Sequence, residues 1–207
     1  MTIRSRNLLA GAILIASFGG CATTGYTPPS EQETLAVIRA GFHDRGIATV
    51  DRLNQTELQA TCSKYHNNPP QDVRAQLEKA ALATVKYPTD GKWLGDFKQG
   101  ERIAQTGVGL QWTDSKTTVN GGNCYACHQL SKEEIAFGNI GPSLYQYAKA
   151  RGTGEENLRY TWGKIWNTHA YNACSQMPRF GDAGILTEAQ IKDVMALLLD
   201  PNSPVNK

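Results

Sequence analysis

The residues of this chain best suited to chemistry are two cysteines and a histidine in one short run, Cys124-Tyr125-Ala126-Cys127-His128. Two thiols three positions apart, followed at once by a histidine, form the attachment site of a c-type haem. The thiols bond to the two haem vinyl groups, and the histidine is placed to ligate the iron. The pattern therefore predicts one covalently attached haem c, with Cys124 and Cys127 as the attachment residues and His128 as the proximal iron ligand.

Cysteine pairs at this spacing also occur in zinc sites and in dithiol redox motifs. A zinc site would need a second pair, but Cys21, Cys62 and Cys174 are isolated in the sequence. A thioredoxin-like motif belongs at a strand–helix junction, whereas residues 119–123, just before Cys124, have the Gly and Asn content of a loop. Haem attachment is the interpretation that these neighbours favour.

A methionine on a loop is the second ligand expected for an electron-transfer haem, because a His–Met pair raises the reduction potential. Met177 lies between predicted helices and is followed by Pro178, which cannot continue a helix. Met195 lies on the apolar side of the last predicted helix, where core packing is the simpler interpretation. We predict Met177 as the distal ligand, with His169 on the same connection as the rival.

A metal-bound histidine normally donates its other ring N–H to a fixed acceptor. Pro142, in the run Gly141-Pro142-Ser143-Leu144, offers a carbonyl held by a stiff backbone. We predict that this carbonyl faces His128. A plain helix start, with Pro142 in the first turn, is the alternative, and both can hold together.

Residues 1–20 have the pattern of a signal peptide, and they predict a periplasmic protein. Arg4 and Arg6 form a positive region, residues 8–18 are mostly apolar, and Gly19 and Gly20 suit cleavage. The apolar run is short for a membrane span, so a retained anchor is the less favoured alternative.

Cys21 follows Phe18-Gly19-Gly20, which is similar to a bacterial lipoprotein box with phenylalanine in place of the usual leucine. Lipidation of Cys21 and ordinary cleavage nearby both stay open.

Export also bears on the remaining cysteines, since disulfides persist in oxidising compartments. We predict that Cys62 and Cys174 pair, the alternative being two buried free thiols.

The charge balance argues against binding to nucleic acid. The full chain has 21 basic and 19 acidic residues, and the first twenty residues hold two arginines and no acid. The remainder therefore balances at 19 and 19, and haem propionates would make it negative. Nucleic acids and anionic membranes generally select basic surfaces, so neither is an expected partner.

The elements that must position these residues are predicted to be helices. Capping-box signals begin at Ser30, Asn54 and Thr187, and apolar residues follow at helical spacing. No convincing alternation for strands occurs, so the chain is predicted to be mainly α. In the N-terminal half, one helix is predicted after Ser30, a short one around Cys62, and two more at about 71–86 and 96–105. In the C-terminal half, one helix is predicted from Gly141-Pro142 through Ala148, one that holds Leu158 to Trp166, and one from Thr187 to just before Pro201.

Over about residues 95–201 these motifs resemble a class I cytochrome c, in that family's order. The resemblance implies its fold, with an additional N-terminal helical segment. It divides the chain into a signal peptide at 1–20, a tether and helical extension at 21–90, and a cytochrome c domain at 91–207. The long insert between Gln105 and Cys124 departs from small members of the family.

More narrowly, the chain resembles the X subunit of the SoxAX cytochromes of bacterial sulfur oxidation. The match rests on three stretches and on the N-terminal helical segment; the stretches are residues 123–128, 137–144 and 173–181. It implies a haem-bearing SoxA-like partner in a heterodimer that acts as an L-cysteine S-thiosulfotransferase. Such a complex oxidatively joins thiosulfate to a cysteine of a SoxYZ-like carrier protein and passes electrons to a downstream cytochrome. This chain is then the electron-accepting subunit, with no catalytic residue of its own.

Two other interpretations compete with this one. A free-standing periplasmic electron shuttle would have the same haem, but it would not need the helices of residues 31–90, unless they stabilise the domain. A haem sensor or peroxidase would need a vacant or labile distal site, which a methionine ligand does not leave.

Overall fold

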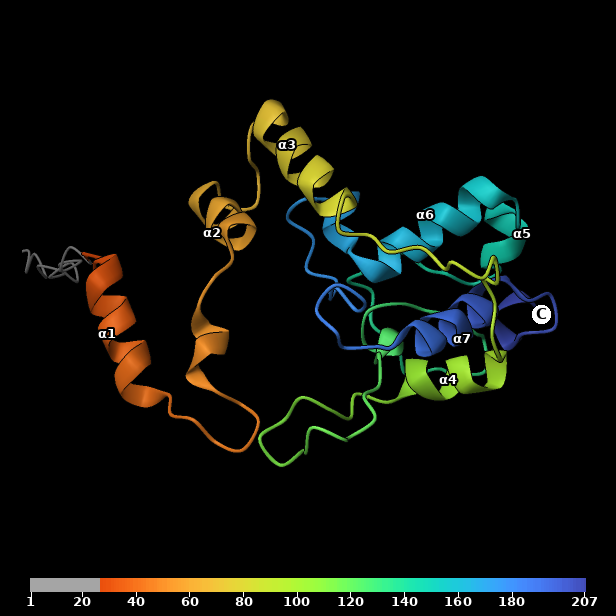
Figure 1. The fold of residues 1–207 in the computed structure, drawn as a ribbon, viewed down its shortest axis with the longest axis horizontal. Coiled ribbons are helices and arrows are strands. Elements are labelled where there is room, and N and C mark those ends of the chain that lie inside the picture. Colours follow the sequence, from red (N-terminus) through yellow and green to blue (C-terminus); the bar gives the residue numbers. More distant parts are fainter. Residues whose placement is uncertain (1–26) are drawn as a thin grey trace, which may run out of the picture. The chain divides into compact units, whose positions relative to one another are not determined.

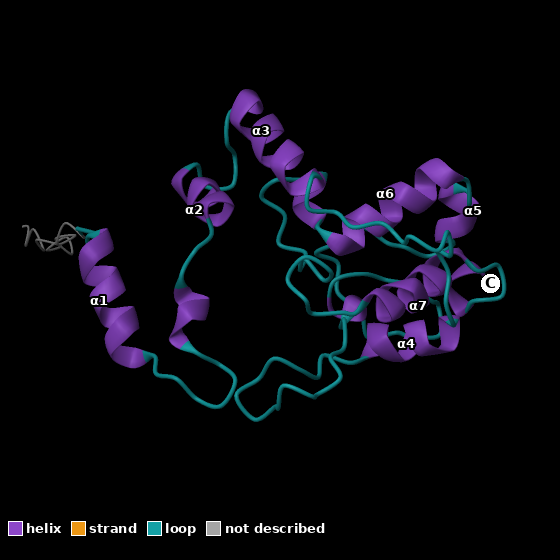
Figure 2. Ribbon diagram, in the orientation of Figure 1, coloured by secondary structure: helices purple, strands orange, loops and turns teal. Residues whose placement is uncertain are grey.

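The computed structural model describes residues 27–207, and within them the fold is built from helices joined by long loops (Figures 1 and 2). No strand forms in this range, where an isolated bridge joins Arg45 and Ala48. The mainly α prediction is therefore confirmed. The α-helices are α1 (Glu31–Gly41), α2 (Glu57–Lys64), α3 (Gln71–Leu82), α4 (Phe97–Gln105), α5 (Tyr147–Arg151), α6 (Glu155–Trp166) and α7 (Glu188–Leu199), with short 3-10 turns at Val50–Leu53, Cys124–Ala126, Thr168–Ala170 and Pro204–Asn206.

The described residues divide into two compact units, 27–41 and 42–207. In the first, α1 begins with the predicted capping box, since Glu33 N–H donates to the Ser30 hydroxyl and Ser30 N–H donates to the Glu33 carboxylate. The predicted signal peptide and Cys21 lie outside the described residues. The boundary predicted between residues 90 and 91 stays a prediction. Within residues 27–207, no helix is both long and apolar enough to cross a membrane.

The second unit is centred on α4 and α7, which lie side by side (Figure 1). Helix α7 begins with a complete capping box between Thr187 and Gln190. A Cβ on Gly100 of α4 would lie 2.2 Å from the backbone oxygen of Asp193 on α7, so only glycine allows the helices this approach. The apolar faces of both helices are buried; they include Ile103 and Ala104 of α4 and Ile191, Val194 and Leu197 of α7.

Helix α6 completes the core with aromatic side chains. Trp162 is fully buried, and its indole N–H donates to the Lys86 carbonyl over 2.8 Å. It stacks on Trp166 one turn later and meets Trp93 edge to face. Trp162 therefore belongs to the core, and its contact with Lys86 ties the segment after α3 to the domain.

The N-terminal extension from Phe42 onward folds onto the rest of the second unit. The Arg45 guanidinium lies 3.2 Å from the centre of the Trp112 ring, and Arg52 donates to the Leu110 carbonyl over 2.6 Å. Both contacts hold the insert that precedes the cysteine motif. The predicted disulfide between Cys62 and Cys174 is present and joins α2 to a loop of the C-terminal half.

Three predicted helix ends differ from the structure. The prediction that a helix opens at Gly141-Pro142 is wrong, because α5 begins only at Tyr147 and the preceding residues form a loop. The second capping box belongs to Thr56 and Gln59 rather than starting at Asn54. Helix α3 ends at Leu82, four residues before the expected end at Lys86, and the chain there turns toward Trp162.

Candidate functional site

The cysteine motif forms a single tight turn. Asn123 adopts a left-handed backbone conformation with φ of 47°, and the N–H groups of Cys127 and His128 both donate to the Cys124 carbonyl. Neither Cys124 nor Cys127 is in a disulfide. Burial raises the pKa of the Cys124 thiol to about 12. The turn thus holds two unpaired thiols separated by two residues, and His128 follows directly.

His128 is held by the segment that follows the turn. Its ring Nδ1 lies 2.7 Å from the Pro142 carbonyl oxygen, the contact that the sequence predicted. With the proton on Nδ1 donated to this carbonyl, Nε2 is left as the nitrogen able to ligate a metal. Gly141 makes the approach feasible, because a Cβ there would lie 2.1 Å from the His128 ring.

Backbone hydrogen bonds hold residues 138–144 against the cysteine turn. Gly138 N–H donates to the Tyr125 carbonyl, and Gly141 N–H donates to the Cys127 carbonyl, each over 2.8 Å. A Cβ on Gly138 would lie 1.9 Å from the Ala126 oxygen. Loop residues 138–144 and the cysteine turn therefore form one hydrogen-bonded unit, which explains why no helix can start at Pro142.

Met177 lies on the loop between α6 and α7. Its N–H donates to the Ser175 hydroxyl, and its partly buried side chain packs against the same hydrophobic cluster as Cys124. The loop is anchored further along by Phe180 N–H, which donates to the Ile165 carbonyl, and by the ion pair of Arg179 with Asp182. The assignment of Met177 as distal ligand stays a prediction. Met195, by contrast, is fully buried in the core of α7, as predicted.

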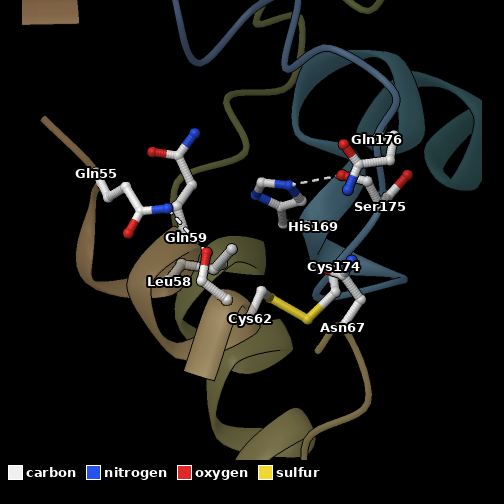
Figure 3. Close-up of a pocket in the computed structure, with 10 residues that line it drawn as sticks. Gln55, Leu58, Gln59, Cys62, Asn67, His169, Cys174, Ser175 and Gln176 are labelled. Atoms are coloured by element: carbon white, nitrogen blue, oxygen red, sulfur yellow. Dashed lines mark hydrogen bonds between the residues drawn. A yellow bond between two sulfur atoms is a disulfide. The ribbon is translucent and has the colours of Figure 1, made fainter. Parts of the chain in front are cut away.

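His169, the rival ligand, lines a polar pocket beside the disulfide (Figure 3). Its Nε2 lies 3.2 Å from the Ser175 carbonyl oxygen, and Gln59 of α2 lines the same pocket. Burial lowers the pKa of His169, which favours the neutral form of its ring. Its ring thus has a hydrogen-bond partner of its own in the pocket shared with α2.

A buried polar cluster behind the cysteine turn was not predicted. The Tyr125 hydroxyl donates to Glu101 of α4 over 2.9 Å and lies 3.1 Å from the Ser131 hydroxyl. Burial raises the pKa of Tyr125 to about 12, and burial also raises the pKa of Glu101. The sequence provides little indication of this cluster, because haem attachment does not require a particular residue type at Tyr125, between the two cysteines.

The described residues fit a covalently bound haem c. The two thiols are unpaired, His128 is oriented by Pro142, and Gly141 leaves room for the imidazole. Trp166 adds a further observation, since its indole N–H is buried without an acceptor among the described residues. A buried donor normally finds a partner, and haem propionates are acceptors of the kind it lacks.

Comparisons with known proteins agree with this fit. A profile of the cytochrome c family matches residues 114–200, which include the cysteine turn, Pro142 and Met177. The chain is also 40% identical, over 157 residues, to a protein of Aquifex aeolicus (strain VF5) described as an uncharacterized lipoprotein. That alignment covers 74% of this chain and 73% of the relative.

Proposed function

Because residues 114–200 of this chain belong to the cytochrome c family, we propose that the protein is an exported one-haem electron carrier held at a membrane by a lipid on Cys21. Cys124 and Cys127 attach the haem, and His128 and Met177 ligate its iron. The bound haem supplies a one-electron couple. The observation that carries the proposal is the 2.7 Å contact between His128 Nδ1 and the Pro142 carbonyl, next to two unpaired thiols.

The residues around His128 serve to keep one ligand in one orientation. The Pro142 carbonyl fixes the tautomer and increases the basicity of the ligating nitrogen. The bonds from Gly138 and Gly141 to the cysteine turn hold that carbonyl in place. A rigid ligand set suits electron transfer, because little has to move when the charge of the iron changes.

Met177 completes this arrangement as a neutral sulfur ligand. A thioether favours the reduced iron relative to a second nitrogen ligand and therefore raises the reduction potential. Two features support Met177 over His169: Met177 packs against the same hydrophobic cluster as Cys124, and the His169 ring is engaged in a hydrogen bond with Ser175.

The lipid anchor is supported by two observations of different kinds. Cys21 directly follows a signal-like segment, and the Aquifex relative is described as a lipoprotein. A Cys21→Ser variant, produced in a bacterium that matures c-type cytochromes, should move from the membrane fraction to the soluble fraction with its haem intact. A variant that stays in the membrane fraction, or a mature protein that starts beyond Cys21 by mass spectrometry, would refute the anchor.

The carrier itself is tested by the haem. The purified protein should contain one haem per chain that survives denaturation, and peptide mass spectrometry should find it on Cys124 and Cys127. Replacing both cysteines with serine should abolish covalent attachment. Covalent haem on any other residue, or none at all, would contradict the proposal.

We further propose, more narrowly, that the carrier accepts electrons in a SoxAX-like L-cysteine S-thiosulfotransferase. The support is the resemblance of residues 123–128, 137–144 and 173–181, together with the helical extension. Forming a sulfur–sulfur bond from thiosulfate and a thiol releases two electrons, whereas one haem iron takes one. This chain would therefore need repeated transfer or a second electron store. The resemblance implies that the bond-forming site lies on a haem-bearing SoxA-like partner and that a SoxYZ-like protein carries the product.

Isolation from the native source separates this role from that of a free-standing shuttle. The subunit role requires a second haem protein that co-purifies, and haem reduction that depends on thiosulfate and the carrier protein. A lone chain that is reduced by other donors and ignores thiosulfate would establish the shuttle. Prompt binding of carbon monoxide by the reduced protein would instead indicate a labile distal site and a sensor or peroxidase.

A further inference from the structure

Glu101 carries a half-buried carboxyl group, and no salt-bridge partner lies beside it among the described residues. One of its oxygens accepts hydrogen bonds from the Tyr125 hydroxyl at 2.9 Å and from the Gln105 side chain at 3.1 Å. The other oxygen, Oε2, is buried and has no partner among the described residues. A carboxylate in this position lacks the solvation of its second oxygen, so protonation of that oxygen relieves the cost of burial.

The charged groups around Glu101 do not neutralise it. The loop after the cysteine turn brings Glu133 and Glu134 near enough to disfavour a second negative charge. On α7, packed against α4, Lys192 is already paired with Asp90 and Glu188, and Asp193 accepts from Asp96 N–H. Burial is the main cause that raises the pKa of Glu101, the Tyr125 hydrogen bond opposes it, and Glu133 and Glu134 raise it further.

The position of this carboxyl group ties it to the haem attachment site. Tyr125, its hydrogen-bond partner, lies between the two attachment cysteines and is only 4% exposed. Cys124 packs against the same cluster as Tyr125. The buried Tyr125 side chain therefore connects Glu101 to the attachment site, and charges act more strongly through such an interior than through solvent.

We propose that Glu101 is a proton-exchanging residue coupled to electron transfer, an inference that rests on the proposed haem carrier. When the iron accepts one electron from a one-electron donor, Glu101 takes up one proton from solvent. When the iron gives up the electron, Glu101 releases that proton. The charge near the attachment site then stays nearly constant through the redox cycle, and Tyr125 remains the hydrogen-bond donor in both states.

The sign of the pH dependence follows from this coupling. Ionised Glu101 favours the oxidised iron, which carries one more positive charge. The reduction potential should therefore fall as pH rises through the pKa of Glu101. Because burial raises that pKa, the fall should lie at a higher pH than the ordinary glutamate pKa of about 4.3. The steepest slope that one proton per electron permits is a tenfold change in the equilibrium constant per pH unit, about 59 mV for a one-electron couple.

Spectroscopic redox titrations of the haem-loaded protein over a range of pH test the proposal. The wild type should show the fall in potential, and Glu101→Gln should remove it and keep the higher potential that the wild type has at low pH. Tyr125→Phe should move the fall to higher pH, because it removes a donor that stabilises the carboxylate. The matched control Glu133→Gln deletes an exposed charge nearby and should keep the fall, moved to lower pH.

Two results would overturn the inference: a wild-type potential independent of pH, or a Glu101→Gln variant that retains the wild-type dependence. If Glu101→Gln does not fold, infrared difference spectra of the wild type replace it, and reduction should produce a carboxylic C=O band that Tyr125→Phe shifts. Absence of such a band would be equally decisive. Failure of haem attachment would instead refute the carrier, so the two failures are distinguishable.

Discussion

His128 and Pro142 are joined by a 2.7 Å contact between a ring nitrogen and a backbone carbonyl, and the glycine before the proline makes that contact feasible. An alanine at Gly141 would place its Cβ 2.1 Å from the imidazole. We expect Gly141→Ala to displace His128 and to reduce the yield of protein with a six-coordinate haem spectrum. Gly154→Ala is the control, because no atom lies within 4 Å of a Cβ at that position, and it should load haem normally. Equal spectra for both variants would contradict the role of Gly141.

Replacement of Met177 tests the distal ligand. Met177→Ala should lower the reduction potential and remove the weak sulfur-to-ferric-iron absorption band, because the neutral thioether that favours reduced iron is lost. Met195→Leu is the control, since Met195 is fully buried in α7 and its replacement conserves core volume. Absence of the sulfur band from the wild type would make the assignment wrong, and retention of the band in Met177→Ala would do the same.

The Cys62–Cys174 disulfide should stabilise the second unit. It links residues 112 positions apart, so its loss frees a long loop in the unfolded chain and should reduce the free energy of unfolding by roughly 2–4 kcal/mol. Denaturant unfolding of the Cys62→Ala/Cys174→Ala double variant against the wild type measures this. Thiol reductants provide a second comparison, because they cleave the disulfide and leave thioether bonds intact. A double variant as stable as the wild type would show that the bridge has no such role.

The stability should also depend on pH through His169. Because burial lowers its pKa in the folded protein, the unfolded chain binds a proton more readily near its ordinary pKa of about 6.5. The contribution of neutral His169 is therefore fully present above that pH and is lost as pH falls below it. Denaturant unfolding at several pH values should show a weaker loss for His169→Gln, whereas a variant of the exposed His43 should behave as the wild type.

Local chemistry in the sequence was enough to predict several features. The capping residues at Ser30 and Thr187 predicted two helix starts, and elimination among five cysteines predicted the disulfide. The contact of Pro142 with His128 followed from the needs of a metal-bound imidazole. Each of these predictions depends on a short stretch of chain or on a residue type with few alternatives.

The predictions that failed, and the features that were missed, depend on contacts between distant segments. Pro142 suits a helix start, but backbone bonds from Gly138 and Gly141 to the cysteine turn hold it in a loop. Glu101 reads as a solvated residue of an amphipathic helix until Tyr125 is placed against it. The contact of Arg45 with Trp112 likewise joins two loops with no pattern that would pair them in advance.

The cross-link between α2 and the Met177 loop has a consequence for proteolysis outside the cell's reducing interior. The segment between α3 and α4, residues 83–96, contains no helix. A single protease cut there would divide the backbone, yet Cys62 on one fragment and Cys174 on the other would keep the fragments joined. With a lipid on Cys21, the nicked protein would still hold its haem at the membrane.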